Sequence, residues 1–138
     1  MLYFETSFPV RYYETDQMAV VHHSNYVRYF ETARSMMMES WGMPMHKFEK
    51  DYSVLIPILE VYCRYRHPAR MGDVLTVSCA IEKVPMARLR IDQKVVNQDG
   101  ELCAEGYVTL GFIDKDSFHP VRCPEALLNI IEKHINDR

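Results

Sequence analysis

YETDQMAVVHHSNYVRYFE, residues 13–31, is the stretch that decides the fold and carries the candidate chemistry. One acid, Asp16, stands directly before a short apolar turn, and two histidines, His22 and His23, follow that turn. Ser24 and Asn25 then supply the residue types that favour helix N-termini. An acid beside an apolar patch and close to a helix N-terminus can support acyl chemistry. We therefore interpret most of the remaining chain as a scaffold for this stretch.

A long apolar helix is predicted to follow, over residues 25–41, because Gly42 and then Pro44 give a strong stop signal. At a rise of 1.5 Å per residue, such a helix is a rod of roughly 25 Å. One face of it is an apolar stripe that consists of Tyr26, Phe30, Ala33, Met37 and Trp41. A helix with so large an apolar face has to pack against a large apolar surface.

Alternating segments on both sides of the helix predict that surface to be a sheet. The expected strands occupy residues 2–12, 54–67, 74–84, 87–97 and 101–113. The first is expected to turn Leu2, Phe4, Phe8, Val10 and Tyr12 to one face, and the second Leu55, Leu59, Val61, Cys63 and Tyr65. We expect the last four strands to follow one another as hairpins, with Asp99-Gly100 as the clearest turn.

The remaining segments complete the predicted domain. Residues 46–53 are expected to form a polar connection, and residues 124–135 a short terminal helix with Leu127, Ile130 and Ile131 on one face. One long helix on a five-stranded antiparallel sheet gives a single α+β domain that spans residues 1–138.

Composition excludes several classes of function. A net charge of −3 with no basic block gives no electrostatic support for binding nucleic acid. The chain has no apolar run of about 18 residues that could span a membrane, and its N-terminus lacks the features of a secretory signal. The four cysteines form no CxxC pair, so we expect reduced core thiols in a cytoplasmic protein.

The order of elements and the motif together resemble the hotdog fold, in which an antiparallel sheet wraps a long central helix. More narrowly, the chain resembles the 4-hydroxybenzoyl-CoA thioesterase-like family, including the acyl-CoA thioesterases associated with the Tol-Pal cluster. The first matching block consists of Tyr13, Thr15, Asp16, Val20, Val21, His23, Tyr26, Phe30, Glu31, Ala33 and Arg34. Two weaker blocks are Pro68-Ala69-Arg70 with Gly72-Asp73, and His119-Pro120-Val121-Arg122 with Pro124. Gln17-Met18-Ala19 departs from the small residues that close relatives often carry there.

The resemblance implies an acyl-CoA thioesterase in which Asp16 is the catalytic carboxylate and the backbone N–H of His23 faces the thioester carbonyl. A helix N-terminus offers unpaired N–H groups and a positive dipole end, which suits an oxyanion. Asp16 either attacks the carbonyl directly or activates water, and the sequence leaves both routes open. We expect His23 and Tyr26 to contact the substrate.

No metal or cofactor is expected, because the adjacent histidines His22 and His23 are poorly placed to converge with Asp16 on one ion. Coenzyme A carries phosphates that basic side chains bind. The candidates for this contact are Arg64, Arg66, Arg70, Lys83, Arg88 and Arg90, and the sequence singles out none of them.

Exposed sheet edges invite pairing, so we expect a homodimer joined edge to edge, with further assembly to a tetramer left open. The resemblance implies that the active site lies at the dimer interface. The expected substrate is an acyl-CoA, with acyl carrier protein as an open alternative carrier and the acyl group undetermined. One alternative function is a non-catalytic acyl-thioester binding module or sensor, which would not need Asp16. Another is a dehydratase of 3-hydroxyacyl thioesters that uses His23.

Overall fold

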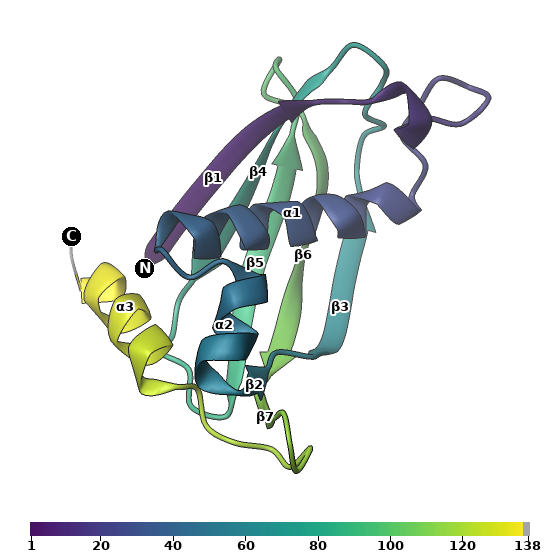
Figure 1. Cartoon of the computed structure of the whole chain (residues 1–138). Coiled ribbons are helices and arrows are strands. Elements are labelled where there is room, and N and C mark those ends of the chain that lie inside the picture. The colour runs from purple at the N-terminus through teal and green to yellow at the C-terminus, as the bar shows by residue number, and fades with distance from the viewer. Residues whose placement is uncertain (137–138) are drawn as a thin grey trace.

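The computed structural model describes residues 1–136 of the chain (Figure 1). One long helix, α1 (Ser24–Ser40), lies across one face of a five-stranded antiparallel sheet. The strands in spatial order are β1 (Leu2–Pro9), β4 (Val74–Ile81), β5 (Arg88–Val96), β6 (Leu102–Gly111) and β3 (Ile58–Tyr65). The smaller elements are the 3₁₀ turn η1 (Tyr12–Glu14), α2 (Met45–Tyr52), β2 (Val54–Leu55), β7 (Ile113–Asp114) and α3 (Glu125–Asn136). This is the helix-on-sheet arrangement of the predicted α+β class.

The core lies between α1 and the sheet, as the apolar stripe predicted. The stripe residues Tyr26, Phe30, Ala33 and Met37 are buried, and Trp41 is half-buried at the end of the helix. Beneath them, the inward residues of β4 are fully buried: Leu75, Val77, Cys79 and Ile81. The helix ends where expected, since Gly42 adopts the left-handed conformation (φ +74°).

A buried amide fixes the helix on the sheet. Gln93 of β5 is 1% exposed, and its Nε2 donates a hydrogen bond to the Phe30 carbonyl of α1 (2.9 Å). Its Oε1 accepts a hydrogen bond from Nη1 of Arg34 (3.0 Å). Each end of the amide therefore binds α1, which sets the height and rotation of the helix over β5.

The prediction for residues 54–67 is wrong in two respects. The segment is two strands, of which β2 pairs with β7, while β3 pairs with β6 at the far edge of the sheet. The expected row of four hairpin-linked strands is therefore broken, because the chain crosses from β3 at one edge to β4 beside β1. The apolar side chains of β3 are not inward either: Leu59, Val61 and Tyr65 are 50%, 40% and 49% exposed. They lie at an edge of the sheet, where α1 makes little contact.

Two smaller predictions are also wrong. Residues 46–53, expected to be a polar loop, form α2, which docks on the core through the buried ring of Phe48 and ends at Ser53 (φ +52°). The first strand stops at Pro9, and Tyr12 is 81% exposed in η1 rather than inward.

The terminal helix is confirmed as α3, with Leu127 and Ile131 buried and Ile130 half-buried. All four cysteines are free thiols. In the described part of the chain, no helix has the length and apolar character needed to cross a membrane.

Candidate active site

The motif loop, residues 15–23, folds back on itself at the N-terminal end of α1. Thr15 pairs with Val21, and the Asp16 N–H donates a hydrogen bond to the Val20 carbonyl (2.9 Å). Ala19 takes the left-handed conformation at the tip (φ +62°), and its N–H donates to the Asp16 carbonyl (3.0 Å). This return brings the chain from η1 back to the start of α1 (Figure 1).

The carboxylate of Asp16 is half-buried and only partly engaged. Its Oδ1 accepts a hydrogen bond from the Met18 N–H (2.8 Å), which orients the side chain. Among residues 1–136, no donor binds its Oδ2. One oxygen thus holds the rotamer while the other is available to a water molecule or a carbonyl carbon.

The N-cap residue of α1 provides no side-chain cap. His23 is the N-cap residue, and its own backbone is already helical (φ −55°, ψ −31°). The N–H groups of Asn25 and Tyr26 donate back to the carbonyls of His22 and His23 (2.9 and 3.3 Å). No backbone hydrogen bond within residues 1–136 uses the His23 N–H as donor. This N–H therefore remains available to an acceptor at the positive end of α1.

The two histidine side chains are exposed and lie against each other, with ring centroids 4.3 Å apart. His22 Nδ1 is within hydrogen-bond distance of the Ser24 hydroxyl (2.9 Å) and accepts from the Ser24 N–H (3.2 Å), so His22 braces the helix start. His23 meets the edge of the Tyr65 ring, 6.3 Å away between centroids. The described residues contain no group of three His, Cys, Asp or Glu side chains that could hold a metal ion.

Glu14 holds both ends of the motif loop, and the sequence analysis did not identify it. Its carboxylate is buried and accepts hydrogen bonds from the Arg11 backbone N–H (2.8 Å), from Arg11 Nη1 (3.1 Å) and from the Tyr29 hydroxyl (2.9 Å). Its carbonyl accepts from the His22 N–H (2.9 Å) and from Nδ2 of Asn25 (2.8 Å). Burial, followed by the bond to Glu14, raises the pKa of Tyr29. The hydroxyl therefore stays protonated and keeps donating to Glu14.

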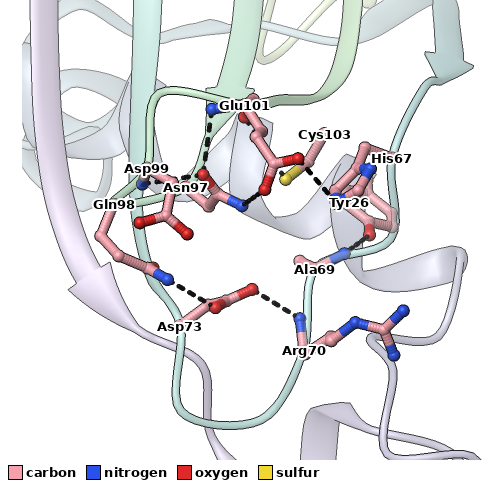
Figure 2. Close-up of polar contacts among 10 residues, drawn as sticks. All are labelled: Tyr26, His67, Ala69, Arg70, Asp73, Asn97, Gln98, Asp99, Glu101 and Cys103. Atoms are coloured by element: carbon pink, nitrogen blue, oxygen red, sulfur yellow. Dashed lines mark hydrogen bonds and ion pairs between the residues drawn. The ribbon is translucent and has the colours of Figure 1, made fainter.

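A second segment, the β3–β4 connection (residues 66–73; Figure 2), forms hydrogen bonds with the motif loop. The Ala69 carbonyl accepts from the Val21 N–H (2.8 Å), and the Met71 N–H donates to the Ala19 carbonyl (3.2 Å). Tyr26 of α1 is 4% exposed, and its hydroxyl oxygen accepts a hydrogen bond from the Ala69 N–H (3.0 Å). In the protomer, Tyr26 thus anchors this connection, and its expected contact with substrate stays a prediction.

The turn between β5 and β6 holds the connection in its place. His67 Nε2 lies 3.2 Å from Glu101 Oε2, and Asp73 accepts hydrogen bonds from the Arg70 N–H (2.8 Å) and from Gln98 Nε2 (2.9 Å). Figure 2 shows the Arg70 side chain extending away from Asp73. The sequence block at residues 68–73 therefore reflects a support for the motif loop.

Comparisons with known proteins identify the family. A model of the thioesterase-like superfamily matches residues 10–131. The YneP protein of Bacillus subtilis strain 168 is 31% identical over 117 residues, which cover 85% of this chain and 84% of that protein. The acyl-CoA thioester hydrolase YbgC of Escherichia coli O157:H7 is 29% identical over 122 residues, which cover 87% of this chain and 90% of that protein.

A solved structure of a thioesterase has the same fold as this chain. The DHNA-CoA thioesterase of Staphylococcus aureus superposes with a TM-score of 0.86 at 27% identity, and the match covers 100% of this chain and 97% of that one. The expected hotdog fold and the expected enzyme class, a thioester hydrolase, are thereby confirmed. The chain belongs to the thioesterase-like superfamily.

Proposed function

We propose that this protein hydrolyses acyl-CoA thioesters, with Asp16 acting on a carbonyl group bound at the N-terminus of α1. The observation that carries the proposal is that the motif loop, which folds back to the start of α1, carries two available groups. These are the free Oδ2 of Asp16 and the unused N–H of His23. The names of YbgC and of the S. aureus enzyme, both of which specify CoA thioesters, support the choice of carrier.

Each group has a defined task in the proposed reaction. The carbonyl oxygen accepts a hydrogen bond from the His23 N–H, which strengthens as the oxygen becomes negative in the tetrahedral intermediate. Asp16 either removes a proton from the attacking water or attacks the carbonyl carbon itself to form a mixed anhydride. In both routes the C–S bond breaks and CoA leaves as the thiol, with a proton that comes from water. In the second route a water molecule then hydrolyses the anhydride, which releases the free acid and restores Asp16.

The active unit is proposed to be a homodimer formed through β3, located in the cytoplasm. This strand is an open edge of the sheet, and Ile58, Leu59, Val61 and Tyr65 are each at least 40% exposed on it. A second β3 would bury them and satisfy the open backbone groups. Tyr65 also donates a hydrogen bond to the His23 carbonyl (3.3 Å), so the proposed interface adjoins the proposed oxyanion donor.

Release of free thiol from a panel of acyl-CoAs tests this function. We expect stoichiometric thiol and free acid from at least one acyl-CoA. Binding of acyl-CoA without thiol release would instead support a sensor. Formation of an enoyl thioester from a 3-hydroxyacyl-CoA, without thiol, would support a dehydratase. If only acylated carrier protein is hydrolysed, the protein is still a thioester hydrolase, but its substrate is carried by acyl carrier protein rather than by CoA.

A further inference from the structure

A cavity of about 310 Å³ lies between α1, α2 and the inner face of the sheet, beyond the motif loop. Its walls include Met37 and Met38 of α1, Met45 of α2, Ile91 of β5, Leu110 of β6 and Leu127 of α3. Five of these six side chains are buried, and Met45 is half-buried. We infer that this cavity receives the far end of a straight aliphatic acyl chain. The inference rests on the proposed thioesterase function, because it supposes that the thioester lies at His23.

The cavity and the proposed carbonyl site lie along one face of α1. At 3.6 residues per turn, Arg34, Met38 and Trp41 fall on nearly the same side of the helix as His23. Arg34, Met38 and Trp41 line the cavity. A chain that leaves a carbonyl at His23 and follows this face passes beside the buried ring of Phe30 before it meets the cavity.

The distance along the helix sets a minimum length for the acyl group. Glu31, the lining residue of α1 nearest to His23, is eight positions further along, which corresponds to about 12 Å of helix. A butyryl or benzoyl group ends well before that point. A decanoyl or longer chain reaches the cavity, so the structure favours medium and long straight chains over short or compact aromatic ones.

The lining has the chemistry that a hydrocarbon tail requires. Of its polar residues, Glu31 is exposed and Ser35 and Glu49 are half-buried, whereas Arg34 extends inward to the buried amide of Gln93 (3.0 Å). Apart from Arg34, the deeper wall is apolar, and its three methionines are flexible enough to adapt to a mobile chain. Each methylene that enters such an apolar wall strengthens binding about fourfold.

Trp41 provides a direct test of binding, because it is the only tryptophan of the chain and lines the cavity. The probe is dodecanoate, kept below its critical micelle concentration, with butyrate as the short comparison. We expect dodecanoate to change Trp41 fluorescence in a saturable way and butyrate to have no effect. Equal responses to both acids, or no saturable response to dodecanoate, would overturn the inference.

Two matched substitutions on α1 locate the site. Met38 lines the cavity and is 6% exposed, whereas Met36 is 42% exposed and is not among the lining residues. Met38→Phe should weaken dodecanoate binding at least tenfold, and Met36→Phe should leave it unchanged. Equal effects of the two would contradict the assignment. Met45→Phe, from the α2 wall, replaces Met38→Phe if circular dichroism shows that the latter does not fold.

Kinetics separate this inference from the proposed function. In the wild type, kcat/KM should rise from hexanoyl-CoA to dodecanoyl-CoA, by up to about fourfold for each methylene that enters the cavity. Met38→Phe should lower kcat/KM for the longer acyl chains and leave kcat/KM for the shorter ones unchanged. If kcat/KM is highest for butyryl-CoA or benzoyl-CoA, the cavity is not an acyl pocket, although the protein is still a thioesterase. Saturable dodecanoate binding without turnover of any acyl-CoA would support the pocket and contradict the proposed thioesterase function.

Discussion

Cys79 shows how one buried group gives the protein a dependence on pH. Its thiol is fully buried on β4 and accepts a hydrogen bond from Nε2 of Gln93 (3.3 Å). Burial raises the pKa of Cys79 from 9.0 to about 12. Below pH 9 the thiol is protonated in both the folded and the unfolded chain. Between pH 9 and 12 only the unfolded chain ionises there, so the stabilising contribution is lost progressively as the pH rises.

We therefore predict a steeper alkaline loss of stability in the wild type than in Cys79→Ala. The free energy of unfolding should fall by about 1.4 kcal/mol more per pH unit above pH 9 in the wild type. Urea unfolding between pH 8 and 10.5 measures this. The variant should also be less stable at pH 7, because it loses packing, but only the slope reports the titration. Parallel curves would contradict the assignment.

Single residues also show which parts of a candidate site can be proposed from a sequence. Asp16 and His23 could be proposed because they are close in the chain and belong to a recognisable motif, and their roles stay predictions. Glu14 was missed, since a carboxylate that is buried by Arg11 and Tyr29 looks the same in sequence as an exposed one. The role of Ala69 depends on contacts with Val21 and Tyr26, more than 40 residues away in sequence, which no local pattern reports.

Among the elements, β3 depends on its pairing with β6, and Gly106 makes that pairing possible. Gly106 stands opposite Cys63 on β3. A Cβ atom at Gly106 would collide with the carbonyl oxygen of Tyr62, which is backbone and cannot rotate away. A Cβ at Gly111 of the same strand would meet only the side chain of Leu59, at 3.1 Å, which can adjust.

Gly106→Ala should accordingly push β3 off the sheet. We expect a loss of about 2 kcal/mol or more in the free energy of unfolding, and a loss of activity, because β3 also contacts His23 through Tyr65. Gly111→Ala, the matched control, should change stability by less than about 1 kcal/mol. Chemical denaturation and thiol-release assays measure both effects. A Gly106→Ala protein as stable as Gly111→Ala would show that β3 is held in another way.

The elements that could be predicted well are those in which apolar residues repeat at a regular helical or strand spacing. The helix over α1 and the alternation of β4 and β5 follow from side chains that face one core. α2 was missed because Phe48 is its only buried residue, so its helical period is hardly visible. The place of β3 was also missed, since its short connection to β4 resembles a hairpin although it crosses the sheet.

At the scale of the whole molecule, the sheet has two open edges that differ in character. β1 forms one edge and contacts α3, while β3 forms the other and presents exposed aliphatic and aromatic side chains. The fold class and the single layer of helix on sheet could be predicted from the order of elements. The assembly could not be settled in this way, because a single chain does not reveal which edge receives a partner.

We predict that a charge on the β3 edge prevents dimer formation, whereas a charge on the β1 edge does not. Val61→Lys should turn the dimer into a 16.3 kDa monomer and lower kcat/KM, since the proposed interface adjoins the site. Tyr3→Lys, on the exposed face of β1, is the control and should remain dimeric. Analytical ultracentrifugation decides between these outcomes. A dimeric Val61→Lys protein with full activity would exclude β3 as the interface.

The central claim is that Asp16 carries out thioester hydrolysis, and one kinetic comparison tests it most directly. Thiol release is measured for the wild type, for Asp16→Asn and for Asp51→Asn, an exposed aspartate of α2. Asparagine keeps an oxygen to accept the Met18 N–H but removes the charge. We expect kcat to fall on the order of 10³-fold in Asp16→Asn with KM little changed, and Asp51→Asn to match the wild type. Full turnover by Asp16→Asn would contradict the account.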